Sequence, residues 1–142
     1  MTMPIRLTAL ATIIAALWLL TACKALDTLI AKDRVELLEP TIRLFAVHMR
    51  WGRYQEAASM LQPGTRWEIA RKINPYPNIR ITEVISNRWI ISPDESKATG
   101  DVRISYYKES SGIVRTVVQQ QTWIYNEQNR QWYLDNDLPD LR

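Results

Sequence analysis

The spacing of apolar and polar positions changes twice along the chain. Residues 7–22 are almost uniformly apolar and are interrupted only by threonine. From about residue 35 the apolar positions recur at helical spacing, and from Ile79 onward they alternate with polar ones. The pattern therefore predicts an apolar leader, then a helical region, and then a region of strands.

Three helices are expected between residues 35 and 73. Pro40 falls inside the first and predicts either a kink or a new helix starting there, because an interior proline removes a hydrogen-bond donor. Gly52 is expected to end or bend this helix. The apolar stripes are Val35, Leu37, Leu38, Ile42, Phe45, Ala46 and Met49 in the first helix, Tyr54, Ala57, Ala58 and Leu61 in the second, and Trp67, Ile69, Ala70 and Ile73 in the third.

Four strands are expected after the helices, because the apolar period changes to two. The apolar positions of the first strand, or bent strand, are Ile79, Ile81, Ile85, Trp89 and Ile91. The others cover about 102–106, 113–125 and 131–135, and turns lie at 93–96, 110–112 and 126–129. The third strand carries apolar residues at both parities, so either face fits against the helices. Helices followed by an antiparallel meander predict an α+β domain, with N-terminal helices packed on a curved four-stranded antiparallel sheet.

Two stretches of the chain carry a likeness to a known fold family. The segments FAVHMRWGRYQEAASMLQPG and TWIYNEQNRQWYLDN resemble the nuclear transport factor 2-like (cystatin-like) superfamily in their order of helix, glycine, aromatic strand and Trp-bearing strand. The resemblance covers about residues 34–136 as a pattern of elements. It implies a cone with a pocket between sheet and helices. Because such a fold hosts both enzymes and non-enzymes, it defines no activity by itself.

The N-terminal segment has the features of a secretion signal. Arg6 precedes an apolar core of 16 residues, which is too short for a comfortable bilayer span. The sequence LTAC that follows resembles the lipobox of bacterial lipoproteins. That resemblance implies cleavage between Ala22 and Cys23, a lipid carrying fatty acids such as palmitate on the Cys23 thiol, and anchoring to a membrane. The open alternative is an uncleaved membrane anchor with an incidental cysteine.

This interpretation divides the chain into a signal peptide (1–22), a lipidated N-terminus and tether (23–33) and a single α+β domain (34–142). Lys24 follows the predicted lipid-bearing residue. In lipoproteins of enteric bacteria an aspartate at this place favours retention in the inner membrane. The resemblance therefore favours the periplasmic face of the outer membrane.

Composition excludes several classes of function. Without the first 22 residues, which include Arg6, the remaining 120 residues carry 17 basic and 15 acidic side chains in mixed order, so nucleic-acid binding is not expected. Only four glycines are present and none forms a phosphate loop. The single cysteine rules out an internal disulfide. One histidine and no cluster of acids predict no metal site, and we expect no cofactor.

Glu83 is the most interesting candidate for chemistry. It falls on the apolar face of the first strand, where burial would raise the pKa of a carboxylate and make it a base near neutral pH. A β-bulge or an edge location would instead turn it to water, and we favour that reading. His48, the only histidine, is a candidate pocket residue, although a place at the boundary of its helix is favoured. Trp89 and Tyr106 complete the candidate pocket, with core packing as the favoured role for most aromatics. No catalytic set is expected.

Two functions follow from these observations. The favoured one is a non-enzymatic accessory or interaction module of the cell envelope, with an envelope protein as its partner and a homodimer through the sheet as a further option. The alternative is a small-molecule-binding or enzymatic cone that uses a buried Glu83. The two differ in one structural feature, which is whether Glu83 lies inside the cone or in solvent.

Overall fold

The computed structural model describes residues 34–63 and 74–141. The chain divides into two compact units, Met1–Asp33 and Arg34–Arg142, and the second is described below. The predicted leader, Ala22, Cys23 and the third predicted helix lie outside the described residues.

Residues 34–50 form one long helix. Its buried face consists of Leu38, Ile42, Phe45 and Met49. The prediction of a new helix at Pro40 is wrong, because the helix runs through this residue. Pro40 is exposed, and one residue further on Thr41 donates its hydroxyl hydrogen to the carbonyl of Leu37 at 2.7 Å. The solvent-facing side thus tolerates the proline.

The long helix ends at Arg50, and Gly52 follows in the turn that terminates it, as predicted. Gly52 has a φ of +69°, a conformation that glycine adopts at little cost. The Arg53 N–H donates to the His48 carbonyl at 2.8 Å and the Gly52 N–H donates to the Met49 carbonyl at 3.3 Å. These two bonds form a Schellman motif, which satisfies carbonyls that the helix end leaves free. The chain then turns into the second helix, α2 (Tyr54–Ser59), whose Tyr54, Ala57 and Ala58 are buried as the stripe predicts.

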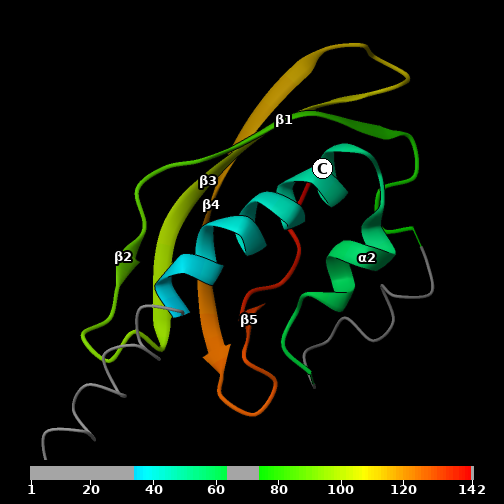
Figure 1. The fold of residues 1–142 in the computed structure, drawn as a ribbon. Helices are drawn as coiled ribbons and strands as arrows, with labels where there is room; N and C mark the ends of the chain where they lie inside the picture. The colour runs from blue at the N-terminus through cyan, green and yellow to red at the C-terminus, as the bar shows by residue number, and fades with distance from the viewer. Residues whose placement is uncertain (1–33, 64–73, 142) are drawn as a thin grey trace, which may run out of the picture. The chain divides into compact units, whose positions relative to one another are not determined.

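An antiparallel sheet of five strands curves around the long helix (Figure 1). Its strands are β1 (Ile79–Ser86), β2 (Ile90–Ile91), β3 (Lys97–Lys108), β4 (Val114–Asn126) and β5 (Gln131–Leu134). The order is β1-β3-β4-β5, and β2 also pairs with β3. The predicted α+β class is therefore confirmed. The predicted count of four strands is wrong by one, because the first strand is interrupted between residues 86 and 90 and its end forms the short β2.

A β-bulge in β1 changes which of its residues face the helix. The register against β3 shifts between Ile81 and Glu83, so that Ile81 pairs with Tyr106 and Val84 pairs with Ile104. Because one extra residue in a strand moves all later side chains to the opposite face, the odd-numbered face is not continuous. Ile81 is buried, whereas Ile85 beyond the bulge is exposed.

The inner face of the sheet holds the core. On β3 the even-numbered residues from Ala98 to Tyr106 are buried, and they pair with odd-numbered residues of β4. The odd parity of β4 therefore faces the helix, which the sequence pattern left open. Trp123 lies against Phe45 of the long helix, with ring centroids 5.6 Å apart and planes at 82°. This edge-to-face contact joins helix and sheet at the centre of the core.

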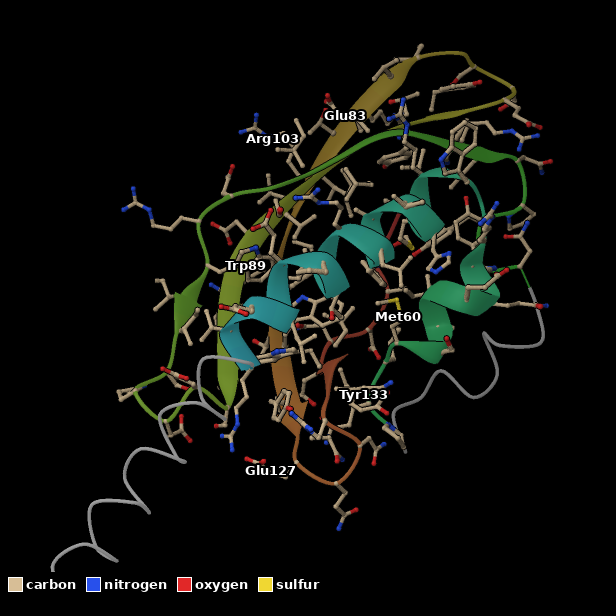
Figure 2. The ribbon with its side chains drawn as sticks, in the orientation of Figure 1. Met60, Glu83, Trp89, Arg103, Glu127 and Tyr133 are labelled. Carbon is tan, nitrogen blue, oxygen red and sulfur yellow. The ribbon has the colours of Figure 1, made fainter. Side chains whose placement is uncertain are left out.

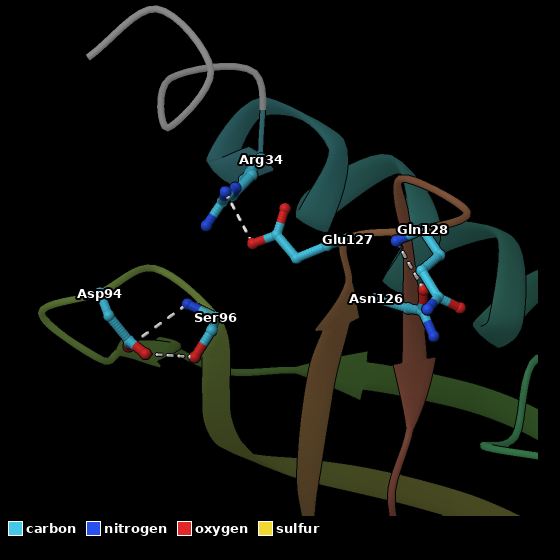
Figure 3. Close-up of polar contacts among 6 residues, drawn as sticks. All are labelled: Arg34, Asp94, Ser96, Asn126, Glu127 and Gln128. Atoms are coloured by element: carbon cyan, nitrogen blue, oxygen red, sulfur yellow. Dashed lines mark hydrogen bonds and ion pairs between the residues drawn. The ribbon is translucent and has the colours of Figure 1, made fainter. Parts of the chain in front are cut away.

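The turn between β2 and β3 lies where the Pro93–Ser96 pattern predicts it, and the Asp94 side chain stabilises it. The Asp94 carboxylate accepts a hydrogen bond from the hydroxyl of Ser92 at 2.5 Å. It accepts a second from the hydroxyl of Ser96 at 2.6 Å (Figure 3). These bonds favour the charged form and lower the pKa of Asp94 from 3.8 to about 2.

The lowered pKa of Asp94 predicts how this turn responds to pH. Since the folded pKa lies below the ordinary value, the stabilisation is complete above about pH 4 and is lost as the pH falls through about 2. An NMR titration of the Asp94 carboxyl should show a midpoint near 2, and Ser96→Ala should move it toward 3.8. Ser110→Ala, outside the turn, should leave it unchanged. A midpoint of 3.8 in the unaltered protein would contradict the prediction.

Candidate functional site

Glu83, the candidate base, lies in solvent, as the favoured interpretation predicted. The bulge turns it to the outer face of the sheet, where it pairs with Ser105 of β3. Figure 2 shows Glu83 and Arg103 on the side of the sheet that faces away from the long helix. This placement confirms the favoured prediction of a β-bulge that turns Glu83 to water, and it does not support the alternative of an inward-facing base. The alternative function loses the residue on which its chemistry depended.

The other three candidate pocket residues, His48, Trp89 and Tyr106, line none of three hollows in the described part of the chain, which lie at the C-terminal segment, on the long helix and at the β4–β5 turn. Tyr106 is buried on the inner face of β3. His48 lies half-buried on the long helix, and its Nδ1 atom is buried without a hydrogen-bond partner in the part of the chain that the structure describes. Trp89 is half-buried in the segment between β1 and β2. The space between helix and sheet is filled by large side chains, with Trp123, Phe45, Met49, Leu61, Ile104 and Leu134 at its centre.

Trp89 packs on the backbone of β3 at Gly100. A Cβ atom built on Gly100 would lie 2.6 Å from the Trp89 Cε3 atom, which is closer than van der Waals contact allows. Gly100 is buried and its φ is not in the left-handed region. Glycine is therefore required here by the indole ring and not by the backbone conformation.

Gly100→Ala should displace the Trp89 ring and lower the free energy of unfolding by about 1–3 kcal/mol, as overpacking does elsewhere. Urea unfolding measures the loss, and a changed Trp emission spectrum reports the displaced ring. In a Trp89→Ala background Gly100→Ala should lower the free energy of unfolding much less, because the obstructing ring is gone. An equal loss of unfolding free energy in both backgrounds would show that the Trp89 ring is not what requires glycine at position 100.

Gln121 forms a buried polar network that the sequence pattern did not reveal. Its side chain is fully buried, its Oε1 accepts from Trp123 Nε1 at 3.3 Å, and its Nε2 donates to Gln119 Oε1 at 3.2 Å. Gln119 Nε2 in turn donates to the carbonyl of Asp137 at 2.8 Å. Burying an amide is costly unless its groups are bonded, so this chain of contacts satisfies the network and ties the C-terminal segment to β4.

A hollow of about 670 Å³ lies where the segment before β1 meets the C-terminal segment. Tyr76 contributes to its wall and donates its hydroxyl hydrogen to the carbonyl of Pro139 at 2.5 Å. Burial raises the pKa of Tyr76 well above its ordinary value. Its hydroxyl is thus neutral and already engaged, which suits a structural contact between the two segments and not proton transfer. In the sequence Tyr76 stands between Pro75 and Pro77, with no local signal of this contact.

One half of β4 presents an open edge of the sheet. β5 pairs with Trp123–Asn126 alone, and among the described residues no strand pairs with the earlier part of β4 on that side. The exposure of the side chains also differs between the two halves of β4. On the outer face of the open half Val114 and Val118 are 60% and 57% exposed, whereas the even-numbered residues of the other half, from Thr122 to Asn126, are half-buried. Because the period of a strand is two, the sequence alone does not show which stretch of β4 lacks a neighbour.

The backbone groups at this open edge can be assigned from the paired half. The Asp135 N–H donates to the Thr122 carbonyl at 2.8 Å, so the main-chain groups of Thr122 point away from β3. Along a strand the N–H and C=O groups of successive residues point alternately to one neighbouring strand and to the other. The β3–β4 register runs without a shift from Val114 to Ile124, so this alternation is unbroken. The N–H and C=O groups that face the open edge therefore belong to Val114, Thr116, Val118 and Gln120.

Other kinds of site are not seen in the described ranges, 34–63 and 74–141. These residues include no group of three or more His, Cys, Asp or Glu side chains placed to hold a metal ion. No helix within them is long and apolar enough to cross a bilayer. Comparison with known proteins adds no assignment, because no family model and no curated protein sequence matches the chain.

Proposed function

We propose that this protein is a lipid-anchored protein of the bacterial cell envelope whose domain is a non-enzymatic interaction module. The leader, the LTAC sequence and Cys23 support the anchor on the periplasmic face of the outer membrane. The curved sheet around a long helix supports a nuclear transport factor 2-like cone. The open edge of β4 is the observation that carries the binding role.

An uncovered strand edge is a template for another strand. Soluble proteins commonly protect such edges with charged side chains, proline or a bulge. Residues 114–120 (VRTVVQQ) contain no proline and no bulge, and Arg115 is their single charged residue. Val114 and Val118 add exposed apolar surface next to the free backbone groups. These features suit an extended segment of an envelope partner, which would add a strand beside β4 through main-chain hydrogen bonds.

Val118→Pro should abolish this binding and leave the fold intact. Proline removes an N–H that points to the open edge and breaks no bond to β3, and prolines are tolerated at such places in edge strands. A strain lacking the gene should be sensitised to detergents or antibiotics. The unaltered gene and Val118→Thr, which keeps the N–H and the branched side chain, should restore resistance, whereas Val118→Pro should not.

Two further variants make this test decisive. Glu83→Gln should restore resistance fully, because the proposal gives Glu83 no chemical role. Gln120→Pro removes a second edge-facing donor and should fail as Val118→Pro does. Membrane fractionation and thermal melting must show that both proline variants are folded and correctly located. Full restoration of resistance by folded proline variants would overturn the binding role of the β4 edge. Failure of Glu83→Gln to restore resistance would favour the alternative function, in which Glu83 has a chemical role.

A homodimer through the sheet is the competing occupant of the same edge. A second copy would pair β4 with β4, and the proline variants would then also be monomeric. Sedimentation of the unaltered protein and Val118→Pro distinguishes this outcome from binding of a different envelope protein.

A further inference from the structure

The long helix carries a second apolar stripe that faces solvent. Leu37, Leu44 and Val47 are between 40% and 50% exposed, and Trp51 at the end of the helix is 70% exposed. Exposed Pro40 lies between them. Isolated surface apolar residues need no explanation, but five along one line of a helix form a continuous strip of the kind that marks an interaction site.

The spacing of this stripe is that of a helix–helix seam. Residues 37, 40, 44, 47 and 51 alternate steps of three and four, which is the repeat of coiled-coil core positions. At 3.6 residues per turn the stripe lies roughly 150° around the helix from the buried face of Leu38, Ile42, Phe45 and Met49. The helix therefore has two apolar faces on nearly opposite sides, and only one is covered by the sheet.

The charged residues along one flank of the stripe are complementary to those of a second, antiparallel copy of the helix. Glu36, Arg43 and Arg50 follow each other at seven-residue intervals beside the seam. If a second copy of the helix packs antiparallel with a two-fold axis near Leu44, Glu36 of each copy faces Arg50 of the other. Arg43 falls near the axis, and its guanidinium is bound to the Glu39 carboxylate at 2.5 Å. In a parallel arrangement Glu36 faces the seam's other flank, which carries Thr41 and His48.

The shape of the surface fits the same arrangement. A shallow hollow of about 450 Å³ is lined by Glu36, Glu39, Pro40, Arg43, Leu44 and Val47. In the antiparallel pair Val47 of the second copy comes opposite Pro40 in this hollow, and Trp51 comes opposite Leu37. Large aromatic side chains near such seams are the residues that contribute most to association.

We propose that the protein forms a homodimer through this stripe, with the long helices of two copies packed antiparallel about Leu44. The proposal requires neither the lipid anchor nor the β4 edge. It is distinct from a dimer through the sheet, since the surface is on the helix and leaves β4 available.

Exchange of the flanking charges tests the pairing directly. Glu36→Arg and Arg50→Glu should each weaken the dimer on the order of tenfold, because each replaces two symmetry-related attractions by repulsions. The double variant Glu36→Arg/Arg50→Glu should regain affinity close to that of the unaltered protein. The full chain, extracted from its host membranes into detergent, is measured by sedimentation equilibrium over a range of protein concentrations.

A second pair of variants controls for general effects of charge on the surface. Leu44→Glu places two like charges at the axis and should leave only monomer, whereas Ile90→Glu, at a residue 74% exposed on β2, should leave the dimer unchanged. An unaltered protein that stays monomeric overturns the proposal, including one that is monomeric yet binds anionic lipid vesicles through this stripe. Single charge reversals without effect, or a double variant that does not recover, overturn the antiparallel pairing with a second copy. None of these outcomes bears on fatty-acid attachment, which is tested separately at Cys23.

Discussion

Cys23→Ser should abolish both fatty-acid attachment and removal of the first 22 residues. The proposed lipid is joined through the Cys23 sulfur, and cleavage of the preceding bond follows lipid attachment in the lipoproteins that the leader resembles. Metabolic labelling with a fatty acid should mark the unaltered protein and not the variant. The intact mass should show a chain that begins at residue 23 in the first case and at Met1 in the second.

The physical consequence of this change is large. Each buried lipid methylene stabilises membrane attachment by about 0.8 kcal/mol, so one chain anchors weakly while two or three anchor almost permanently. Cys23→Ser/Thr28→Cys is the matched control, because it restores a thiol outside the LTAC context and should also remain unlabelled. An unaltered protein that starts at Met1 and carries no fatty acid would overturn the anchor and the compartment proposed with it.

Trp123→Ala should lower the free energy of unfolding by about 3–5 kcal/mol. Trp123 is fully buried at the centre of the core, packs edge-to-face on Phe45 and bonds Gln121 through its Nε1. The substitution removes the largest buried side chain, leaves a cavity and deprives the Gln121 Oε1 of its donor. Because small domains are stable by only about 5–15 kcal/mol, the variant should be near the limit of folding.

Urea unfolding followed by circular dichroism measures this loss without relying on Trp emission. Ile90→Ala is the control, since Ile90 is largely exposed and its truncation should change stability by no more than about 0.5 kcal/mol. Similar midpoints for the two variants would mean that Trp123 and Phe45 do not form the centre of the core.

Local sequence signals were sufficient for most of the elements. The change of apolar period from helical to alternating predicted the α+β order, and Gly52 and the Pro93–Ser96 turn predicted where elements end. These features depend on the conformational preferences of a few adjacent residues. One of the two alternatives at Pro40, a new helix starting there, is wrong, because a proline on the solvent side of a helix is tolerated when the apolar face of that helix is packed on the core.

The candidate site depended on contacts between distant residues. Glu83 shares the parity of Ile81, yet one extra residue in β1 turns it to solvent, and no local signal marks that bulge. The partner of Gln121 and the glycine requirement at Gly100 arise from side chains brought together only by folding. Alternation alone therefore does not decide on which face of β1 Glu83 lies.

By itself the sequence determined the order of helices before strands and the turns at Gly52 and Pro93–Ser96, because each depends on short-range spacing and backbone preference. The leader and its cysteine stay predictions. The tertiary structure alone decided which parity of β4 faces the helix, which half of β4 lacks a neighbouring strand, and which of the two apolar stripes on the long helix is buried. Those outcomes depend on which surfaces meet, and surface pairing is a property of the whole fold.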